Sequence, residues 1–312
     1  MKISLVIIYN HNFEANVPVL NRVYSGRFSH VWHVMPFYRG SDDNVIGVYE
    51  NSYYFGGYVS QALHRFETND VSHYLFVPDD MILNPRLNEG NLLQNLSMAD
   101  GDAFISNFKL MNDEHLMNWW AALPSLMGLL VRSNSCEWRG HLPSEERARE
   151  MFQGMGMNCA DGVSVRLFEI ARRTCRFLAT GKCQIPPPFS LLKRFYRFFS
   201  SKEKTYPLAW GYSDVFMVPQ RTIRDFCHCV GVLSAARVFV EAAIPTALVL
   251  TQKRIATLAD VGFKAENGVD DYRVRAKLEA ETDMDYGEFA KKFPVDYLYI
   301  HPVKLSKWRN LP

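Results

Sequence analysis

The segment Lys2-Ile-Ser-Leu-Val-Ile-Ile-Tyr9 is a continuous apolar run, rich in β-branched residues, and it ends at the polar residues Asn10 and His11. Unbroken apolar runs of this length are typical of strands that are buried on both faces, as in a parallel sheet. We therefore expect a first parallel strand here, with Asn10 and His11 at the edge of the sheet where that strand ends.

Apolar runs and helical patterns alternate over the first hundred residues. The patterns predict helices at 13–24 and 57–66, and strands at 31–37, 45–49, 73–77 and 102–108. This alternation predicts an α/β fold with a mostly parallel central sheet flanked by helices. Further along, the sequence predicts two strands and one buried helix, at 215–218, 295–300 and 238–250. Ligands of such sheets bind beyond the carboxyl ends of the strands.

Length and composition restrict the class of protein. The chain has 312 residues, of which 48% are hydrophobic, and a formal net charge of +2, which excludes a disordered tail, a collagen and a small disulfide scaffold. Six cysteines are too dilute for a disulfide framework, and from the sequence we expect neither a secretory leader nor a membrane-spanning segment. We expect a single large domain in a reducing, cytoplasmic compartment.

Two adjacent acids follow the strand predicted at 73–77, in the segment His73-Tyr-Leu-Phe-Val-Pro-Asp79-Asp80. Carboxylates at the end of a buried strand are suited to hold a hard cation such as Mg²⁺ or Mn²⁺, which usually shares its site with substrate phosphates. The alternative is an Asp-rich turn, in which Asp79 and Asp80 only cap the segment that leads to Pro85.

This arrangement resembles the GT-A fold of nucleotide-sugar-dependent glycosyltransferases, in which an acidic metal motif follows a hydrophobic strand at about this distance. The resemblance covers roughly the first hundred residues, and a looser one is to bacterial enzymes of surface polysaccharide and lipopolysaccharide assembly. It implies transfer of a sugar from a nucleotide diphosphate, most often a UDP-sugar, to a hydroxyl of a glycan, assisted by Mn²⁺ or Mg²⁺. Since the acids are adjacent rather than spaced, Asp80 is the better-aligned metal ligand, and Asp79 serves the metal, its surroundings or the donor ribose.

A second polar group follows the strand predicted at 295–300. The resemblance implies that His301 completes the metal site, and that Lys304, Lys307 and Trp308 help to hold the diphosphate. Imidazole is a suitable ligand for ions such as Mn²⁺, and lysine neutralises charge on a departing phosphate. The alternative is an ordinary chain end, where lysine and histidine are common.

A third group lies around the strand at 215–218. The resemblance places the acceptor between a turn that contains Asp214 and an acid, Glu241, at the start of a later helix. An inverting transferase needs one carboxylate to take the proton of the attacking hydroxyl. Because Glu241 stands in an apolar run, burial would raise its pKa toward the working range of a general base. Alternatively, Glu241 faces solvent or pairs with Arg237, one turn earlier.

Position in the sequence alone suggests which residues bind the nucleotide. Tyr9, Asn10 and His11 lie where the first strand opens, a place suited to stack on a base and to hydrogen-bond with it, and Arg39 follows the second strand, from where it could reach a diphosphate. A solvated loop is the alternative for both.

The resemblance divides the chain into a donor-binding half at 1–110, a helical insertion at 111–205, and an acceptor-binding half with a closing segment at 206–312. Within the insertion, ten basic residues of 166–204 stand against two acidic ones, so this segment carries +8 and the rest of the chain −6. After Pro188 an apolar stripe with helical spacing predicts an amphipathic basic helix, formed by Leu191, Leu192, Phe195, Phe198 and Phe199.

That helix raises a second hypothesis, a peripheral membrane or polyanion-binding module without catalysis. The two hypotheses are compatible, because an enzyme that extends a lipid-linked glycan works beside an anionic membrane surface, here the inner face. A helix packed on the protein's own core is the alternative. A phosphodiester-cleaving metal enzyme has less support, since such sites draw on more acids and histidines. Nothing in the sequence indicates nucleic-acid binding.

Overall fold

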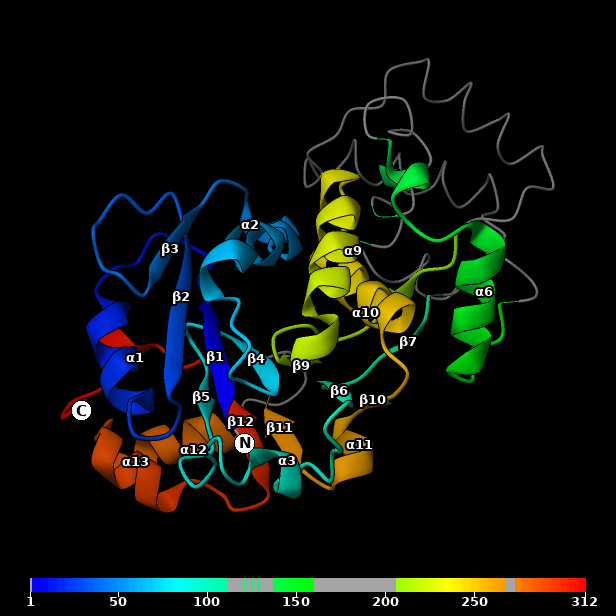
Figure 1. The fold of residues 1–312 in the computed structure, drawn as a ribbon. Coiled ribbons are helices and arrows are strands. Elements are labelled where there is room, and N and C mark those ends of the chain that lie inside the picture. The colour runs from blue at the N-terminus through cyan, green and yellow to red at the C-terminus, as the bar shows by residue number, and fades with distance from the viewer. Residues whose placement is uncertain are drawn as a thin grey trace, which may run out of the picture.

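A seven-stranded sheet, in the order β10-β6-β9-β4-β1-β2-β3, lies at the centre of the computed structural model (Figure 1). The structure describes residues 2–111, 121, 125, 128–129, 137–159, 206–266 and 273–312. The strands of this sheet are β1 (Ile3–Ile8), β2 (His30–Pro36), β3 (Val45–Val48), β4 (His73–Pro78), β6 (Ala103–Ile105), β9 (Phe216–Pro219) and β10 (Ile255–Ala256). The mixed α/β fold and the mostly parallel sheet predicted from the sequence are confirmed.

One strand of the described sheet runs against the others. β1 pairs in parallel with β2 and β4, whereas β9 pairs antiparallel with β4 on one side and with β6 on the other. Consequently the residues that precede β9 lie at the same edge of the sheet as the residues that follow β4. The apolar run at 215–218 predicted this strand but not its direction.

Two small sheets stand beside the main one. β12 (Tyr297–Ile300) lies between β11 (Lys264–Glu266) and β5 (Ile82–Leu83), and β7 (Lys109–Leu110) pairs with β8 (Ala209–Trp210). Strands from the first 110 residues thus pair with strands from beyond 206 in all three sheets.

Helices cover both faces of the main sheet. One core contains Val6 and Ile8 of β1 and the apolar faces of α2 (Gly56–Phe66), α9 (Ile223–Ala235) and α10 (Val240–Thr251). The other contains Ile3, Leu5 and Ile7, with α1 (Asn16–Tyr24), α12 (Arg273–Thr282) and α13 (Tyr286–Lys292). Figure 1 shows α9 and α10 on the side of the sheet opposite to α1 and α13. Successive residues of β1 therefore enter different cores, which explains why its apolar run is unbroken.

The structure describes further helices. They are α3 (Leu92–Asn95), α6 (Glu145–Gly154) and α11 (Leu258–Val261), with 3₁₀ turns at Ser52–Tyr54, Trp138–Gly140, Gln220–Thr222 and Leu305–Lys307. Ser144 caps the start of α6, because its side chain accepts a hydrogen bond from the backbone N–H of Arg147 at 3.2 Å.

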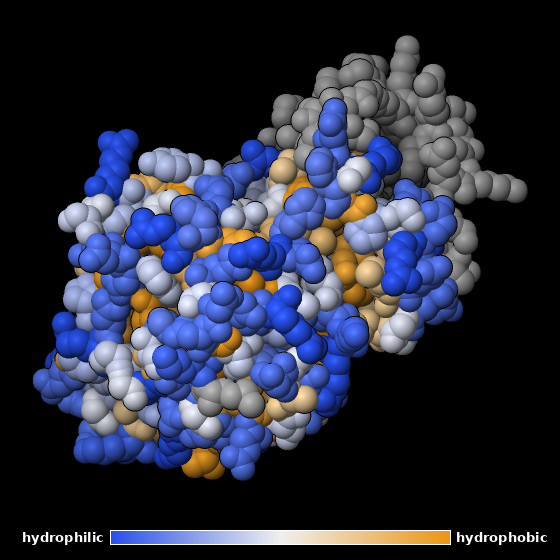
Figure 2. Space-filling model, viewed as in Figure 1, coloured by the Kyte–Doolittle hydropathy of each residue, from blue (hydrophilic) through white to orange (hydrophobic). Residues whose placement is uncertain are grey.

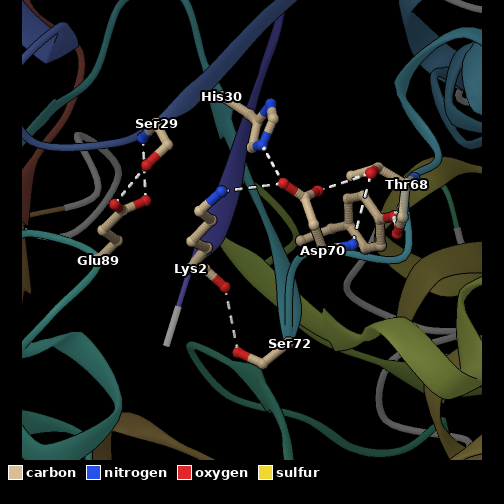
Figure 3. A network of polar contacts seen from close by, with 8 residues as sticks. Lys2, Ser29, His30, Thr68, Asp70, Ser72 and Glu89 are labelled. Atoms are coloured by element: carbon tan, nitrogen blue, oxygen red, sulfur yellow. Dashed lines mark hydrogen bonds and ion pairs between the residues drawn. The ribbon is translucent and has the colours of Figure 1, made fainter.

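A polar network closes the amino edge of the main sheet (Figure 3). The carboxylate of Asp70, which precedes β4, lies 3.0 Å from Lys2 Nζ before β1 and 3.1 Å from His30 Nε2 at the start of β2. Thr68 donates to the same carboxylate at 2.6 Å, and these hydrogen bonds hold the pKa of Asp70 below its usual value. The network ties three neighbouring strands together at the edge opposite to the acids that follow β4.

The surface seen in Figure 2 is mostly hydrophilic over the described residues. Within them, no helix combines the length and the apolar character needed to cross a membrane. The basic segment 166–204, with its predicted amphipathic helix, lies outside the described residues. Its membrane-binding role therefore stays a prediction.

Candidate active site at the carboxyl edge of the sheet

Asp79 and Asp80 lie at the carboxyl edge, directly after β4. The backbone N–H of Asp79 donates to Ile8 O at 3.0 Å, and the Asp79 carboxylate accepts from the side-chain amide of Asn16 at 2.9 Å. Burial, followed by the neighbouring charge of Asp80, raises the pKa of Asp79 to about 6. Asp79 is thus turned toward the start of α1, while the side chain of Asp80 keeps 35% of its surface exposed.

The register of β12 against β5 explains why His301 lies beside Asp80. The two strands are antiparallel, with Ile300 opposite Ile82 and Tyr299 opposite Leu83. The chain therefore leaves β12 at the point where it enters β5 from Asp80. The backbone N–H of Val303 also donates to Asp80 O, which holds the segment after β12 against the acids.

The His301 ring lies between two carboxylates. Nε2 is 3.0 Å from Asp80 Oδ1, and Nδ1 is 3.5 Å from Asp214 Oδ2. Burial by itself would lower the pKa of His301, but the hydrogen bond to Asp80 and the charges of Asp214, Asp80 and Asp79 outweigh burial and raise it. Among the described residues, Nδ1 has no hydrogen-bond partner of good geometry, so Asp214 acts on it mainly through its charge.

Asp214 reaches this edge because β9 is antiparallel. It lies in the turn before that strand, where burial raises its pKa, while the charge of His301 and a hydrogen bond from Tyr212 act in the opposite direction. The turn is held from two sides: Tyr212 N–H donates to Asn107 Oδ1 at 2.8 Å, and Gly211 N–H donates to Glu241 O at 3.0 Å. A Cβ at Gly211 would lie 2.2 Å from Asn107 O, so this approach requires glycine.

Glu241 lies in the first turn of α10, as predicted for an acid at the start of a helix. Burial, with a contribution from the charge of Asp214, raises the pKa of Glu241 to about 7. Arg237, the alternative partner, lies 2.8 Å from Glu50 instead. A carboxyl group with a pKa near neutrality is suited to accept a proton at physiological pH.

Tyr9 was expected to stack on a nucleotide base, and this expectation is wrong. Its ring is fully buried, and its hydroxyl lies 2.8 Å from Nδ1 of His33, whose Nε2 lies 2.9 Å from Asn21 Oδ1. Asn21 Oδ1 also accepts from Asn44, so it is the acceptor of the His33 Nε2–H. Burial lowers the pKa of His33 to about 4, so the ring is neutral and Nδ1 accepts from Tyr9. The apolar strand pattern continued through Tyr9, which is why the ring belongs to the core.

Asn10, His11 and Arg39 are exposed at the carboxyl edge. This edge also carries two exposed aromatic side chains that the sequence did not single out, Phe37 after β2 and Tyr49 after β3. They are 55% and 67% exposed, and their rings meet edge to face with centroids 6.1 Å apart.

Phe37 has a backbone conformation that is unusual for a bulky residue, with φ 58°. It is held there by Phe37 N–H donating to Val48 O at 2.9 Å and by Asn12 donating to Phe37 O at 3.2 Å. An aromatic after each of two adjacent strands is the sequence signal that would have identified the pair.

The closing segment after β12 separates into exposed and buried residues. Lys304 and Lys307 are exposed, one and four positions after the Val303 contact with Asp80. Trp308 is buried, and its ring packs edge to face on Phe289 of α13 with centroids 4.6 Å apart. The expectation that Trp308 holds the diphosphate is therefore wrong, because its ring is part of the core.

The donor set at this edge fits a metal ion only in part. Asp80 Oδ1 and His301 Nε2 are adjacent and of a suitable type for Mn²⁺, with Asp214 beside the second ring nitrogen, the position that carboxylates commonly take behind a ligating histidine. Within the described residues, however, no group of three or more His, Cys, Asp or Glu side chains is arranged to hold a metal. Two protein ligands suffice only if substrate phosphates and water complete the shell, as is usual for Mg²⁺.

Comparison with known proteins identifies no family directly. No protein-family model matches the chain, and no curated protein matches it. Among solved structures, the bifunctional glycosyltransferase WbbM is similar at 9% identity and a TM-score of 0.34, with 96% of this chain covering 45% of that one. The galactosyltransferase LgtC, determined with donor and acceptor sugar analogues, is similar at 12% identity and a TM-score of 0.37, with 100% and 91% covered.

Proposed function

We propose that the protein is a nucleotide-sugar-dependent glycosyltransferase with a GT-A-type arrangement. The observation that carries the proposal is the 3.0 Å contact between Asp80 and His301, 221 positions apart, at the carboxyl edge where α/β sheets bind ligands. Three further ionisable groups converge there: Asp79, Asp214 and Glu241. Within this cluster, the pKa of Asp79 is raised to about 6 and that of Glu241 to about 7. Carboxyl groups with pKa values raised toward neutrality are common at catalytic sites.

The donor is proposed to lie along this edge, from β3 to β4. Asp80 and His301 would hold Mn²⁺ or Mg²⁺ on the diphosphate, and the bound ion would neutralise charge that develops on the leaving group. The exposed side chains of Lys304 and Lys307, in the closing segment, would add positive charge beside the diphosphate. The exposed ring of Phe37, rather than Tyr9, offers a face to the base, with Asn10, His11 and Arg39 as polar neighbours.

The acceptor hydroxyl is proposed to lie between Glu241 and the sugar. Glu241 takes the hydroxyl proton as the oxygen attacks the anomeric carbon, and the electron pair of the breaking C–O bond leaves with the nucleotide diphosphate. This assignment makes the reaction inverting. Asp214 stands between Glu241, whose pKa it raises, and His301, whose pKa it also raises, so its charge affects both halves of the site.

The first experiment is nucleotide release from a panel of UDP-, GDP- and other nucleotide sugars, with Mn²⁺, with Mg²⁺ and with EDTA. The proposal expects one donor class to be turned over, faster with metal. A matched control is Asp43→Ala, which removes an exposed acid before β3, at the opposite edge of the sheet. Turnover that is lost in Asp80→Ala and kept in Asp43→Ala supports the site, whereas no turnover of any donor by the wild type contradicts the proposed function.

The acceptor is proposed to be a glycan, and the basic segment 166–204 suggests a lipid-linked one beside an anionic membrane surface. Headgroup attraction is screened beyond a Debye length of about 8 Å at physiological ionic strength. The protein should therefore sediment with anionic liposomes at low salt and be released at high salt. Failure to sediment at low salt would contradict the membrane association and leave the transferase proposal unaffected.

A further inference from the structure

Pro245 lies inside α10, four residues after Glu241. In an α-helix the backbone N–H of residue i donates to the carbonyl of residue i−4, and proline has no N–H. The carbonyl of Glu241 therefore lacks the helical donor that any other residue at position 245 would supply. A buried carbonyl without a hydrogen-bond donor destabilises the fold, so we ask which other group donates to the Glu241 carbonyl.

The replacement partner is the turn that carries Asp214. Glu241 O accepts from Gly211 N–H at 3.0 Å. One helical position beyond Pro245, Thr246 Oγ1 accepts from Ala209 N–H at 2.9 Å. The N–H groups of Ala209 and Gly211, two residues apart on β8 and its continuation, thus both bind α10, while β8 pairs with β7 on its other side.

We propose that Pro245 is a positioning residue, which keeps the Glu241 carbonyl available for Gly211 and thereby fixes the Asp214 turn against the catalytic end of α10. The tie joins the acid proposed as the base, Glu241, to the loop whose carboxylate lies 3.5 Å from His301. The role in turnover rests on the proposed function, whereas the hydrogen bond itself does not.

The hydrogen bond from Gly211 to the Glu241 carbonyl also affects the environment of the Glu241 carboxyl group. Its pKa is raised by burial and by Asp214, and the turn is otherwise held at Tyr212 by Asn107. If residue 245 regained an N–H, that group would compete for the Glu241 carbonyl, and the Gly211 N–H would be left with water or nothing. The turn would then relax away from α10, and the separation of Asp214 from Glu241 would increase.

The test compares two substitutions that differ in one N–H. Pro245→Ala restores the donor, whereas replacement of Pro245 by lactic acid, the α-hydroxy acid analogue of alanine, forms a backbone ester with the alanine side chain and no donor. Amide hydrogen exchange at Gly211 is the first readout. We expect protection in the wild type and in the ester variant, and at least a tenfold faster exchange in Pro245→Ala.

The second readout is the pH dependence of turnover of the best donor. Pro245→Ala should lower kcat by about tenfold and leave the nucleotide KM within about twofold. The pH at which kcat rises, which reports the pKa of the base, should shift to a lower value. The ester variant should resemble the wild type in all three respects. A proline that only shapes the helix would affect the melting temperature of both variants alike. Equal Gly211 exchange in the two variants would overturn the proposal. Absence of turnover in the wild type would instead contradict the proposed function and leave the exchange result to decide the hydrogen bond.

Discussion

The imidazole of His301 and the carboxylate of Asp80 face each other at 3.0 Å although 221 positions separate them in the chain. The antiparallel pairing of β12 with β5 produces this contact, because β5 begins two residues after Asp80 and β12 ends immediately before the histidine. The last strand therefore brings a histidine ring to the candidate site beside Asp80.

The first prediction concerns His301. Substitution by alanine removes the nitrogen donor beside Asp80 and leaves the core intact, since the ring lies at the edge of the sheet. Loss of a group that only supports a ligand already costs metal affinity about 10–100-fold. We expect Mn²⁺-dependent nucleotide affinity to fall by at least that factor in calorimetry, with an unchanged melting temperature. An equal affinity at every metal concentration would remove His301 from the site.

The second prediction concerns the pH dependence that Glu241 confers. Its pKa is raised to about 7 in the folded protein, above the usual value of 4.5 for a glutamate side chain. Below pH 4.5 the group is protonated in both states; between 4.5 and 7 only the unfolded state releases the proton, so the free energy of unfolding falls as pH rises. Above pH 7 this loss is constant, at about 3 kcal/mol, because each unit of pKa difference corresponds to about 1.4 kcal/mol.

Glu241→Gln should therefore be inactive and more stable than the wild type above pH 7, with equal stability near pH 4. Urea unfolding at pH 4 and pH 8, combined with turnover, checks both parts. Donor binding should be spared, because the amide keeps the shape of the side chain. A variant that turns over the donor normally would contradict the role of Glu241 as base.

The third prediction separates the residues of the closing segment. Trp308→Ala should destabilise the fold by about 3–5 kcal/mol, since the ring packs in the core against Phe289. Lys304→Ala and Lys307→Ala change exposed residues and should alter stability by less than about 0.5 kcal/mol while weakening nucleotide binding. Chemical denaturation and calorimetry on the three variants measure the contrast. Lysine variants with wild-type nucleotide affinity would exclude both lysines from the donor site.

The fourth prediction contrasts two aromatic residues. Tyr9→Phe leaves Nδ1 of buried His33 without its donor and should cost about 1–3 kcal/mol of stability. Phe37→Ala should instead lower nucleotide affinity, since stacking of a base on an aromatic ring contributes about 1–3 kcal/mol. Its effect on the melting temperature should be small, because the side chain is 55% exposed. Unchanged nucleotide binding by Phe37→Ala would show that the base lies elsewhere.

Much of the fold could be predicted from the sequence because the apolar runs are long and distinct. The strands at β1 to β4 and the buried helix α10 follow directly from them, with ends that shift by at most two residues. The direction of β9 could not be predicted, since a four-residue apolar run carries no information on its neighbours. That direction depends on pairing with β4 and β6, which are far away in the chain.

The site was predictable in so far as its residues follow strands. Asp80, His301 and Asp214 each lie next to a strand end, and the fold brings these ends together. Tyr9 and Trp308 were misjudged because their position beside polar residues said nothing about the direction of the ring. Asn16 was missed, since its contact with Asp79 depends on how α1 packs against the end of β4.

The most direct test of the central claim is calorimetry of UDP binding to the wild type and to Asp80→Ala, each with Mn²⁺ and with EDTA. If UDP is not the nucleotide of the preferred donor, the nucleoside diphosphate found in the panel replaces it. Asp80 and His301 together with the metal are expected to hold the diphosphate, so the wild type should bind at least about 100-fold more tightly with Mn²⁺ than with EDTA. Asp80→Ala should lose that difference. Equal, metal-independent binding by both proteins would contradict the account.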